Sequence, residues 1–203
     1  MNYLAHLYLS GQNESIQVGN FIGDYVKGKQ YEKFAPEIQK GILLHRQIDS
    51  FTDKHSKIKE AADLFRPRYG RYSGIVIDIV FDHFLASGWN NYSVVSLRNY
   101  SKHAYAVLLS HFSILPRRVK LFLPFLIQHK RLESYAHFEG LSESLEIMAR
   151  RTSLPDEADY AMQVLHANYS ELQNIFNSFF KELLLFVEET FEVDIKKPAS
   201  CGS

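Results

Sequence analysis

The stretch from residue 41 to residue 55, GILLHRQIDSFTDKH, sets metal-binding and proton-transfer groups into a pattern that is typical of a helix core. At about 100° per residue, one quadrant of such a helix holds His45, Asp49, Thr52 and Asp53. An apolar stripe lies beside this quadrant, so the carboxylates face the protein interior. Burying an ionised carboxylate without a partner is costly, so each acid requires a cation, a metal ion or hydrogen-bond donors.

A second stretch, IVIDIVFDHFL at residues 75 to 85, is apolar on all sides of a helix, which is typical of a buried helix. Only Asp78, Asp82 and His83 interrupt it. Asp78 and Asp82 are one turn apart and point the same way, so we expect them to serve one site together with His83.

Histidines and aspartates in apolar or helix-periodic settings are concentrated in the first 83 residues: His6, Asp24, His45, Asp49, Asp53, Asp78, Asp82 and His83. Mixed imidazole and carboxylate ligands suit Mn²⁺, Fe²⁺ or Zn²⁺, whereas Mg²⁺ prefers oxygen ligands and retained waters. The alternative is a set of buried ion pairs with Arg46 or Lys27, as in a helical binding protein without catalytic activity.

The 203 residues, 46% of them hydrophobic, predict one folded all-α domain of about eight helices. Within it we expect a helix over residues 15–27 that Gly28 terminates, a helix from Pro36 to about Lys54, and a long closing helix from Pro155 to about residue 191. The domain is expected to span residues 1–195, and residues 196–203 to form a flexible tail in which Cys201 has no role.

The 23 basic residues balance the 23 acidic ones, so no bulk charge favours nucleic acid. We find no signal peptide and no apolar stretch of membrane-spanning length, which predicts a cytoplasmic protein without stable membrane association. Motifs for nucleophilic serines, phosphate-binding loops and dinucleotides are absent from the sequence, as are the Glu-x-x-His repeats of di-iron bundles. Hydrolysis by metal-activated water is the remaining chemistry.

Four segments in a fixed order carry a family resemblance: Asn2-Tyr-Leu-Ala-His6, Gly19-Asn-Phe-Ile-Gly-Asp24 with Lys27-Gly28, Gly41-Ile-x-x-His45-Arg-x-Ile-Asp49-x-x-Thr-Asp53, and Asp82-His83-Phe-Leu85. They resemble the acyl carrier protein phosphodiesterase family, itself similar to a divergent branch of the HD-type metal-dependent phosphohydrolases. The resemblance implies a single-domain helical bundle with a divergent HD-domain fold. The contiguous His-Asp pair of ordinary HD proteins is missing, and only the reversed Asp82-His83 doublet is present.

The resemblance implies hydrolysis of the phosphodiester between 4′-phosphopantetheine and a serine of holo acyl carrier protein. The products are the apo carrier and 4′-phosphopantetheine, and the cofactor is Mn²⁺, with Mg²⁺ or Fe²⁺ as alternatives. The expected metal ligands are Asp24, His45, Asp49, Asp82 and His83. The expected catalytic group comprises His6, Asp53 and Asp78 beside the metal, with Lys27 and Arg46 stabilising charge on the phosphoryl group.

The carrier is acidic as a class, so a neutral enzyme requires a local basic surface to bind it. Arg66, Arg68 and Arg71 are the first choice for this surface, and Arg117, Arg118 and Lys120 the second. A second enzymatic hypothesis retains the metal site but replaces the carrier with a nucleotide or another small phosphoester.

Overall fold

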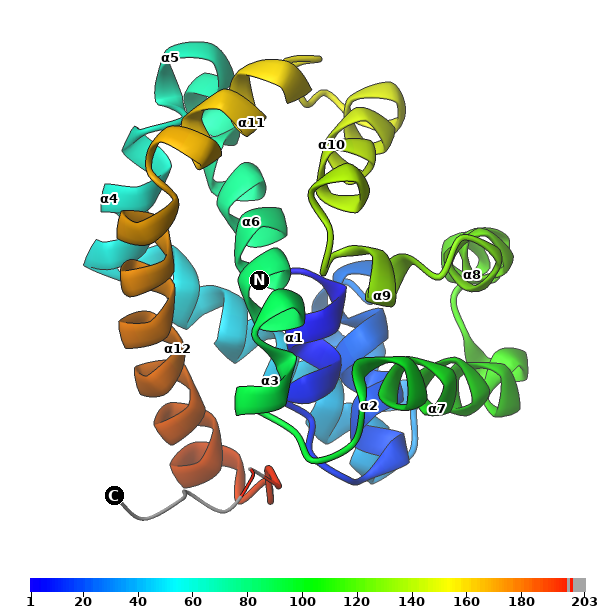
Figure 1. Ribbon diagram of the computed structural model, residues 1–203. Helices are drawn as coiled ribbons and strands as arrows, with labels where there is room; N and C mark the ends of the chain where they lie inside the picture. The colour runs from blue at the N-terminus through cyan, green and yellow to red at the C-terminus, as the bar shows by residue number, and fades with distance from the viewer. Residues whose placement is uncertain (197, 199–203) are drawn as a thin grey trace.

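The computed structural model describes residues 1–196 and 198, and within these ranges it contains twelve α-helices and no strand (Figure 1). The expected all-α class is therefore confirmed. The helices are α1 (Tyr3–Tyr8), α2 (Glu14–Ile22), α3 (Pro36–Lys54), α4 (Ser56–Asp63), α5 (Arg66–Tyr69), α6 (Ser73–Ser87), α7 (Leu97–Ser110), α8 (Arg117–Gln128), α9 (Arg131–Ser134), α10 (Phe138–Arg151), α11 (Ala158–Ala167) and α12 (Tyr169–Phe191). Short 3-10 turns lie at η1 (Gly23–Tyr25), η2 (Gly28–Lys33), η3 (Gly70–Tyr72), η4 (Trp89–Asn91) and η5 (Phe112–Ile114).

Helix α3 begins and ends where the sequence predicts. Pro36 suits its first turn, because amide hydrogens there have no partner within the helix and proline has none to leave unbonded. It packs closely on α2 through two glycines. A Cβ added to Gly19 would lie 2.1 Å from the Ile38 carbonyl oxygen, and one added to Gly41 would lie 2.3 Å from the Ile16 oxygen. The two backbones therefore approach one another at a distance that no larger residue permits.

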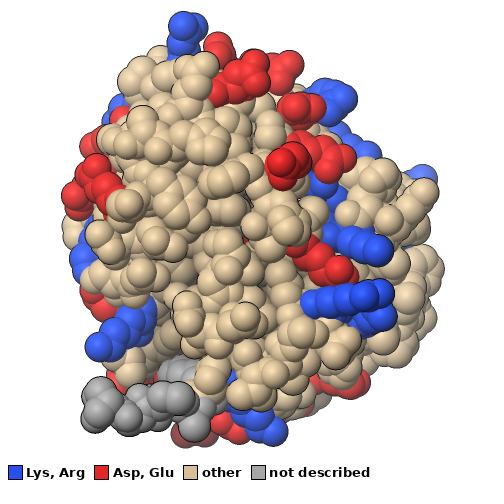
Figure 2. All heavy atoms as spheres, in the orientation of Figure 1, with Lys and Arg blue, Asp and Glu red and all other residues tan. Residues whose placement is uncertain are grey.

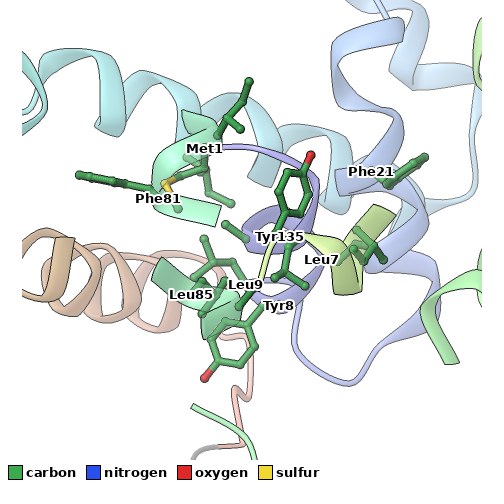
Figure 3. Packing of buried hydrophobic residues seen from close by; sticks show 14 of the residues in the cluster. Met1, Leu7, Tyr8, Leu9, Phe21, Phe81, Leu85 and Tyr135 are labelled. Atoms are coloured by element: carbon green, nitrogen blue, oxygen red, sulfur yellow. The ribbon is translucent and has the colours of Figure 1, made fainter. Parts of the chain in front are cut away.

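Helix α6 runs through the middle of the molecule, with α12 along one side and α8 at the opposite edge (Figure 1). Most of its residues are buried, as its apolar composition predicts. In Figure 3, Met1, Leu9, Phe81 and Leu85 gather where the start of the chain meets α6. The first helix is thus fixed between α6 and α2, which determines where His6 lies.

Two helix predictions are wrong in detail. The segment after Pro155 is not one helix, because α11 ends at Ala167 and Asn168 leaves the helical conformation before α12 begins. The helix that starts near residue 14 does not continue to Lys27 but ends at Ile22 and tightens into η1. Breaks of this kind raise the number of described α-helices from about eight to twelve.

None of the helices in the described ranges combines the length and the apolarity that crossing a bilayer requires. Most of the predicted tail, residue 197 and residues 199–203 with Cys201, lies outside the described residues. The division into a domain of residues 1–195 and a tail stays a prediction.

Candidate metal centre

Three side chains from α1 and α3 converge at one point near the surface. The His6 Nε2 atom lies 3.2 Å from Asp49 Oδ1, and His45 Nε2 lies 3.1 Å from Asp49 Oδ2. The two imidazole rings stack with their centroids 4.1 Å apart. One donor atom from each of these three residues lies within 4.8 Å of the others, so the group could hold a metal ion.

Asp24 joins the group from η1, with its Oδ1 atom 3.4 Å from His45 Nε2. The preceding Gly23 allows this approach, because a Cβ there would lie only 2.2 Å from the Cγ atom of His45. The Asp24 side chain is 67% exposed and that of Asp49 is 39% exposed, whereas both histidines are buried. We call His6, His45, Asp49 and Asp24 the candidate metal centre; its carboxylates form the side that faces solvent.

Asn20 on α2 fixes the orientation of His6. Its amide nitrogen donates to the His6 carbonyl oxygen at 2.8 Å and to Ser10 Oγ at 2.9 Å, so its Oδ1 atom is left as the acceptor for His6 Nδ1 at 2.8 Å. The Nδ1 atom therefore carries the hydrogen, and Nε2 points a lone pair into the centre. An outer partner that fixes the tautomer in this way is usual for metal-binding histidines.

The surroundings of both Nε2 atoms favour a cation. His6 Nε2 faces the Asp49 carboxylate and the Met1 carbonyl oxygen, 3.2 Å away, and both of these groups are acceptors. Neither ring nitrogen of buried His45 makes a hydrogen bond among the described residues, although Nε2 lies close to two carboxylates. Lone pairs and carboxylates directed at one point fit a divalent ion.

Charges within the centre follow from burial and from these contacts. Burial, reinforced by the charge of His45, lowers the pKa of His6 to about 4. Burial would also lower the pKa of His45. The nearby carboxylates of Asp24 and Asp49 have the larger effect together and raise this pKa to about 9. Burial would raise the pKa of Asp49, yet its close contacts with His45 and His6, and the positive charge of His45, hold it well below its ordinary value. At neutral pH the centre therefore contains two carboxylates, the neutral imidazole of His6 and the protonated imidazole of His45, which gives up its Nε2 hydrogen when a metal ion binds.

The structure does not bring Asp82 and His83 to this centre. Asp82 is fully buried and accepts the backbone N–H groups of Leu4 at 2.8 Å and Ala5 at 3.2 Å. Its carboxylate satisfies the free donors at the start of α1. Asp78, one turn earlier, accepts the amino group of Met1 at 2.8 Å. Both acids hold the first turn of α1 and so position His6.

His83 projects from α6 toward different partners. Its Nδ1 atom lies 2.8 Å from the Tyr135 carbonyl oxygen, and its ring stacks on Phe138 with the centroids 5.0 Å apart. Burial lowers the pKa of His83, so the ring is neutral and Nδ1 is the donor to that carbonyl. The residue contributes to packing between α6 and α9–α10.

The two predicted catalytic cations, Lys27 and Arg46, meet at the loop after η1, where Lys27 lies and which Arg46 contacts from α3. Arg46 donates to the carbonyl oxygens of Val26 at 2.9 Å and Gly28 at 2.8 Å, and its guanidinium lies 5.2 Å from the Tyr31 ring centroid. Arg46 therefore ties α3 to this loop. Lys27 sits within the same loop and is exposed, three residues after Asp24.

Asp53 is exposed one turn after Asp49 on α3, where it lines a surface depression together with Arg66 and Arg71. Arg66 pairs with Asp63 at 2.8 Å, and Arg71 donates to the Tyr72 hydroxyl at 2.7 Å. The third arginine of this set, Arg68, lies 3.7 Å from Glu157 outside the depression.

The second basic set, Arg117, Arg118 and Lys120, lies on the first turns of α8, where Lys120 donates to the Ser113 carbonyl oxygen at 2.7 Å. Figure 2 shows Lys and Arg side chains gathered on the α8 side of the molecule. The sequence analysis gave no role to Asn20 or Ser10; the position of Asn20 four residues before Asp24, on one face of a helix, was the available signal.

Fold and centre together define an all-α protein in which two buried histidines and two solvent-facing carboxylates form a cluster that could hold a metal ion. The sequence model of the acyl carrier protein phosphodiesterase family matches residues 1–183. The chain belongs to this family, which confirms the resemblance inferred from its motifs.

Relatives named acyl carrier protein phosphodiesterase align over nearly their whole length. The Yersinia pestis protein is 31% identical over 185 residues, which cover 91% of this chain and 96% of that protein. The Klebsiella pneumoniae (strain 342) protein is 31% identical over 189 residues, covering 93% and 98% of the two chains. The Photorhabdus laumondii protein is 29% identical over 185 residues, covering 91% and 93%. No solved structure matches the chain significantly.

Proposed function

We propose that this protein is a metal-dependent phosphodiesterase that hydrolyses the 4′-phosphopantetheine–serine diester of holo acyl carrier protein. The products are the apo carrier and 4′-phosphopantetheine. The observation that carries this proposal is that the family match spans every residue of the candidate metal centre, and these residues converge in space although they come from three separate elements. Convergence of this kind indicates a functional site, because burying two histidines beside two carboxylates costs stability unless the group serves a purpose.

The proposed metal ligands are His6 Nε2, His45 Nε2 and the carboxylates of Asp49 and Asp24. Two imidazoles with two carboxylates suit Mn²⁺ or Fe²⁺ better than Mg²⁺, and we propose Mn²⁺ as the native ion. A bound divalent ion supplies a water of lowered pKa and polarises a phosphoryl oxygen. Asp82 and His83 are left out of this ligand set, because their side chains are bonded elsewhere.

Other residues of the chain orient the reacting groups. Asn20 holds His6 in the tautomer that leaves Nε2 free, and Asp78 and Asp82 hold the first turn of α1. Arg46 positions the loop of Val26 and Gly28, and Lys27 within that loop is the proposed cation for the charge that develops on the phosphoryl group.

The proposed docking surface for the acidic carrier is the basic rim of Arg66, Arg68 and Arg71. Arg66 and Arg71 line a depression that also contains Asp53, one turn from the ligand Asp49 on the same helix. A carrier bound here would bring its modified serine toward the exposed carboxylates of the centre. Reversing two charges with Arg66→Glu and Arg71→Glu should lower kcat/KM for the carrier at least tenfold at low salt and less at high salt.

The activity test incubates the purified protein with holo acyl carrier protein and Mn²⁺ and records the intact mass of the carrier. Wild type should remove the phosphopantetheine mass, whereas Asp49→Ala should reduce the rate at least a hundredfold. Asp159→Ala, which removes an exposed carboxylate from α11, should behave as wild type. An unchanged carrier mass with Mn²⁺, Mg²⁺, Fe²⁺ and Zn²⁺ would refute the proposal and favour another phosphoester or a binding role.

A further inference from the structure

A cavity of about 440 Å³ lies between the start of α1, the η1 turn, and helices α8 and α10. Its volume falls within the range of about 300–1,000 Å³ that is usual for sites of small organic ligands. Its apolar walls include Phe122, Phe125 and Met148, and three arginines, Arg118, Arg131 and Arg151, also line it. None of the residues that line it belongs to the candidate metal centre.

Two residues that line the cavity are close in sequence to residues of the candidate metal centre. Its lining residue Tyr25 follows Asp24, and its lining residue Tyr3 lies one helical turn before His6 on α1. The hydroxyl groups of Tyr3 and Tyr25 lie 3.1 Å apart, which joins the two sides of this boundary. The cavity is therefore next to the elements that carry His6 and Asp24, and this tyrosine pair lies at the boundary.

Polar atoms are set among these apolar walls. The Asn2 side chain donates to the Tyr135 hydroxyl at 3.0 Å, and the Ser144 hydroxyl also lines the cavity. An elongated ligand with amide groups and methyl groups fits such a lining, because buried amides need hydrogen-bond partners while methyl groups need apolar contact. The pantetheine arm has this composition, with two amides, a geminal dimethyl group and a terminal thiol.

We propose that this cavity binds the pantetheine arm of the substrate while the phosphodiester lies at the candidate metal centre. The inference rests on the proposed function for its choice of ligand. The arm enters past Tyr3 and Tyr25, its dimethyl group contacts Phe122, and its amides reach the polar atoms of Asn2, Tyr135 and Ser144. The serine side of the diester then leaves the centre in the other direction, toward the carrier.

A competing groove of about 600 Å³ shares Tyr25 with the cavity and is otherwise lined by residues that include Phe34, Ile38 and Ile114. It contains no residue of α1, which carries His6. Its side-chain hydroxyl and amide groups are those of Tyr25 and the exposed Gln30, whereas the cavity also has the buried hydroxyl groups of Tyr135 and Ser144. The chemistry of the pantetheine arm therefore favours the cavity between α8 and α10.

The test measures binding of pantetheine itself, without phosphate, by calorimetry on the Mn²⁺-loaded full chain. Met148→Trp fills the cavity from α10 and should weaken binding at least tenfold. Ile147→Trp is a second filling variant in case the first is unfolded, and Ile114→Trp fills the competing groove as the matched control. Thermal melting of each variant within about 3 °C of wild type establishes that the variants are folded.

Loss of pantetheine binding in the cavity variants, with normal binding in Ile114→Trp, supports the inference. Equal binding in all variants, loss only in Ile114→Trp, or no binding of pantetheine to wild type overturns it. Turnover of holo acyl carrier protein is measured separately and should fall at least tenfold in kcat/KM in the cavity variants. If wild type binds pantetheine in the cavity but does not cleave the carrier, the proposed function fails while the binding site stands.

Discussion

His6 and Asn20 act as a pair, because one amide group fixes both the ring orientation and the tautomer of the histidine. The amide is fully buried and all three of its contacts are polar, so its orientation is determined by Ser10 and by the His6 backbone. The lone pair that His6 presents to the centre is thus a consequence of a residue on a different helix.

Asn20→Ala should weaken Mn²⁺ binding about 10- to 100-fold, because His6 loses the acceptor that holds its Nδ1 hydrogen. It should also cost about 1–3 kcal/mol of folding free energy, since buried polar groups lose their partners. Metal affinity is measured by calorimetry. Asn13→Ala is the control, because Asn13 caps the same helix through the Ile16 N–H and should cost about 1 kcal/mol without changing Mn²⁺ affinity. Equal affinities in the two variants would contradict the role of Asn20.

At the scale of elements, α6 acts on the centre through α1. Two neighbouring residues on α6, Asp82 and His83, bond to different elements because successive residues of a helix point about 100° apart. Asp82 accepts a backbone N–H group from the first turn of α1, and His83 contacts the segment that joins α9 and α10. Their adjacency in sequence therefore does not place them in one site.

Asp82→Ala should destabilise the protein by about 2–5 kcal/mol, because it leaves two buried backbone N–H groups of α1 without an acceptor. It should also weaken Mn²⁺ binding, since α1 carries His6. Asp82→Asn retains one acceptor oxygen and should lose less stability. Urea unfolding and metal titration of the two variants check this. An Asp82→Ala protein with wild-type stability but no metal binding would instead make Asp82 a direct ligand.

His83→Asn should bind Mn²⁺ within about threefold of wild type, and it should alter the pH dependence of stability. Burial lowers the pKa of His83 in the folded state, so its contribution is complete above the unfolded value of about 6.5 and is lost as the pH falls through the folded value. Wild type should therefore lose stability more steeply than His83→Asn between pH 7 and pH 5. Urea unfolding at several pH values measures the two slopes, and parallel slopes would contradict the assignment.

In the molecule as a whole, the candidate metal centre joins three segments that are separate in sequence, α1, η1 and α3. A ligand that binds only the folded state stabilises it in proportion to the logarithm of its concentration. The centre is therefore expected to contribute to the stability of the fold as well as to catalysis.

Removal of metal with EDTA should lower the melting temperature. At about 100 times the dissociation constant, Mn²⁺ contributes about 2.7 kcal/mol, which corresponds to about 5–10 °C for a chain of this size. His45→Ala should melt at the same temperature with and without Mn²⁺, because it lacks a ligand of the centre. Differential scanning calorimetry gives both values. A wild-type protein insensitive to EDTA and to added Mn²⁺ would contradict a metal site here.

The all-α class, the bounds of α3 and the family could be predicted from the sequence, because helical periodicity and short motifs are local properties of the chain. The sequence also placed His45 and Asp49 on one face, since residues four apart on a helix are always neighbours.

The residues that pack against each helix face could not be predicted in this way, because they depend on the fold of the whole chain. Spacing shows that Asp82 and His83 are buried, but their partners belong to α1 and to the segment after α9, which are about 50 to 80 residues away in the chain. In the same way, Asn20 became the partner of His6, and the cavity arose between helices far apart in sequence. A helix pattern specifies which side of a helix is buried, whereas the packing of the whole chain specifies the neighbour.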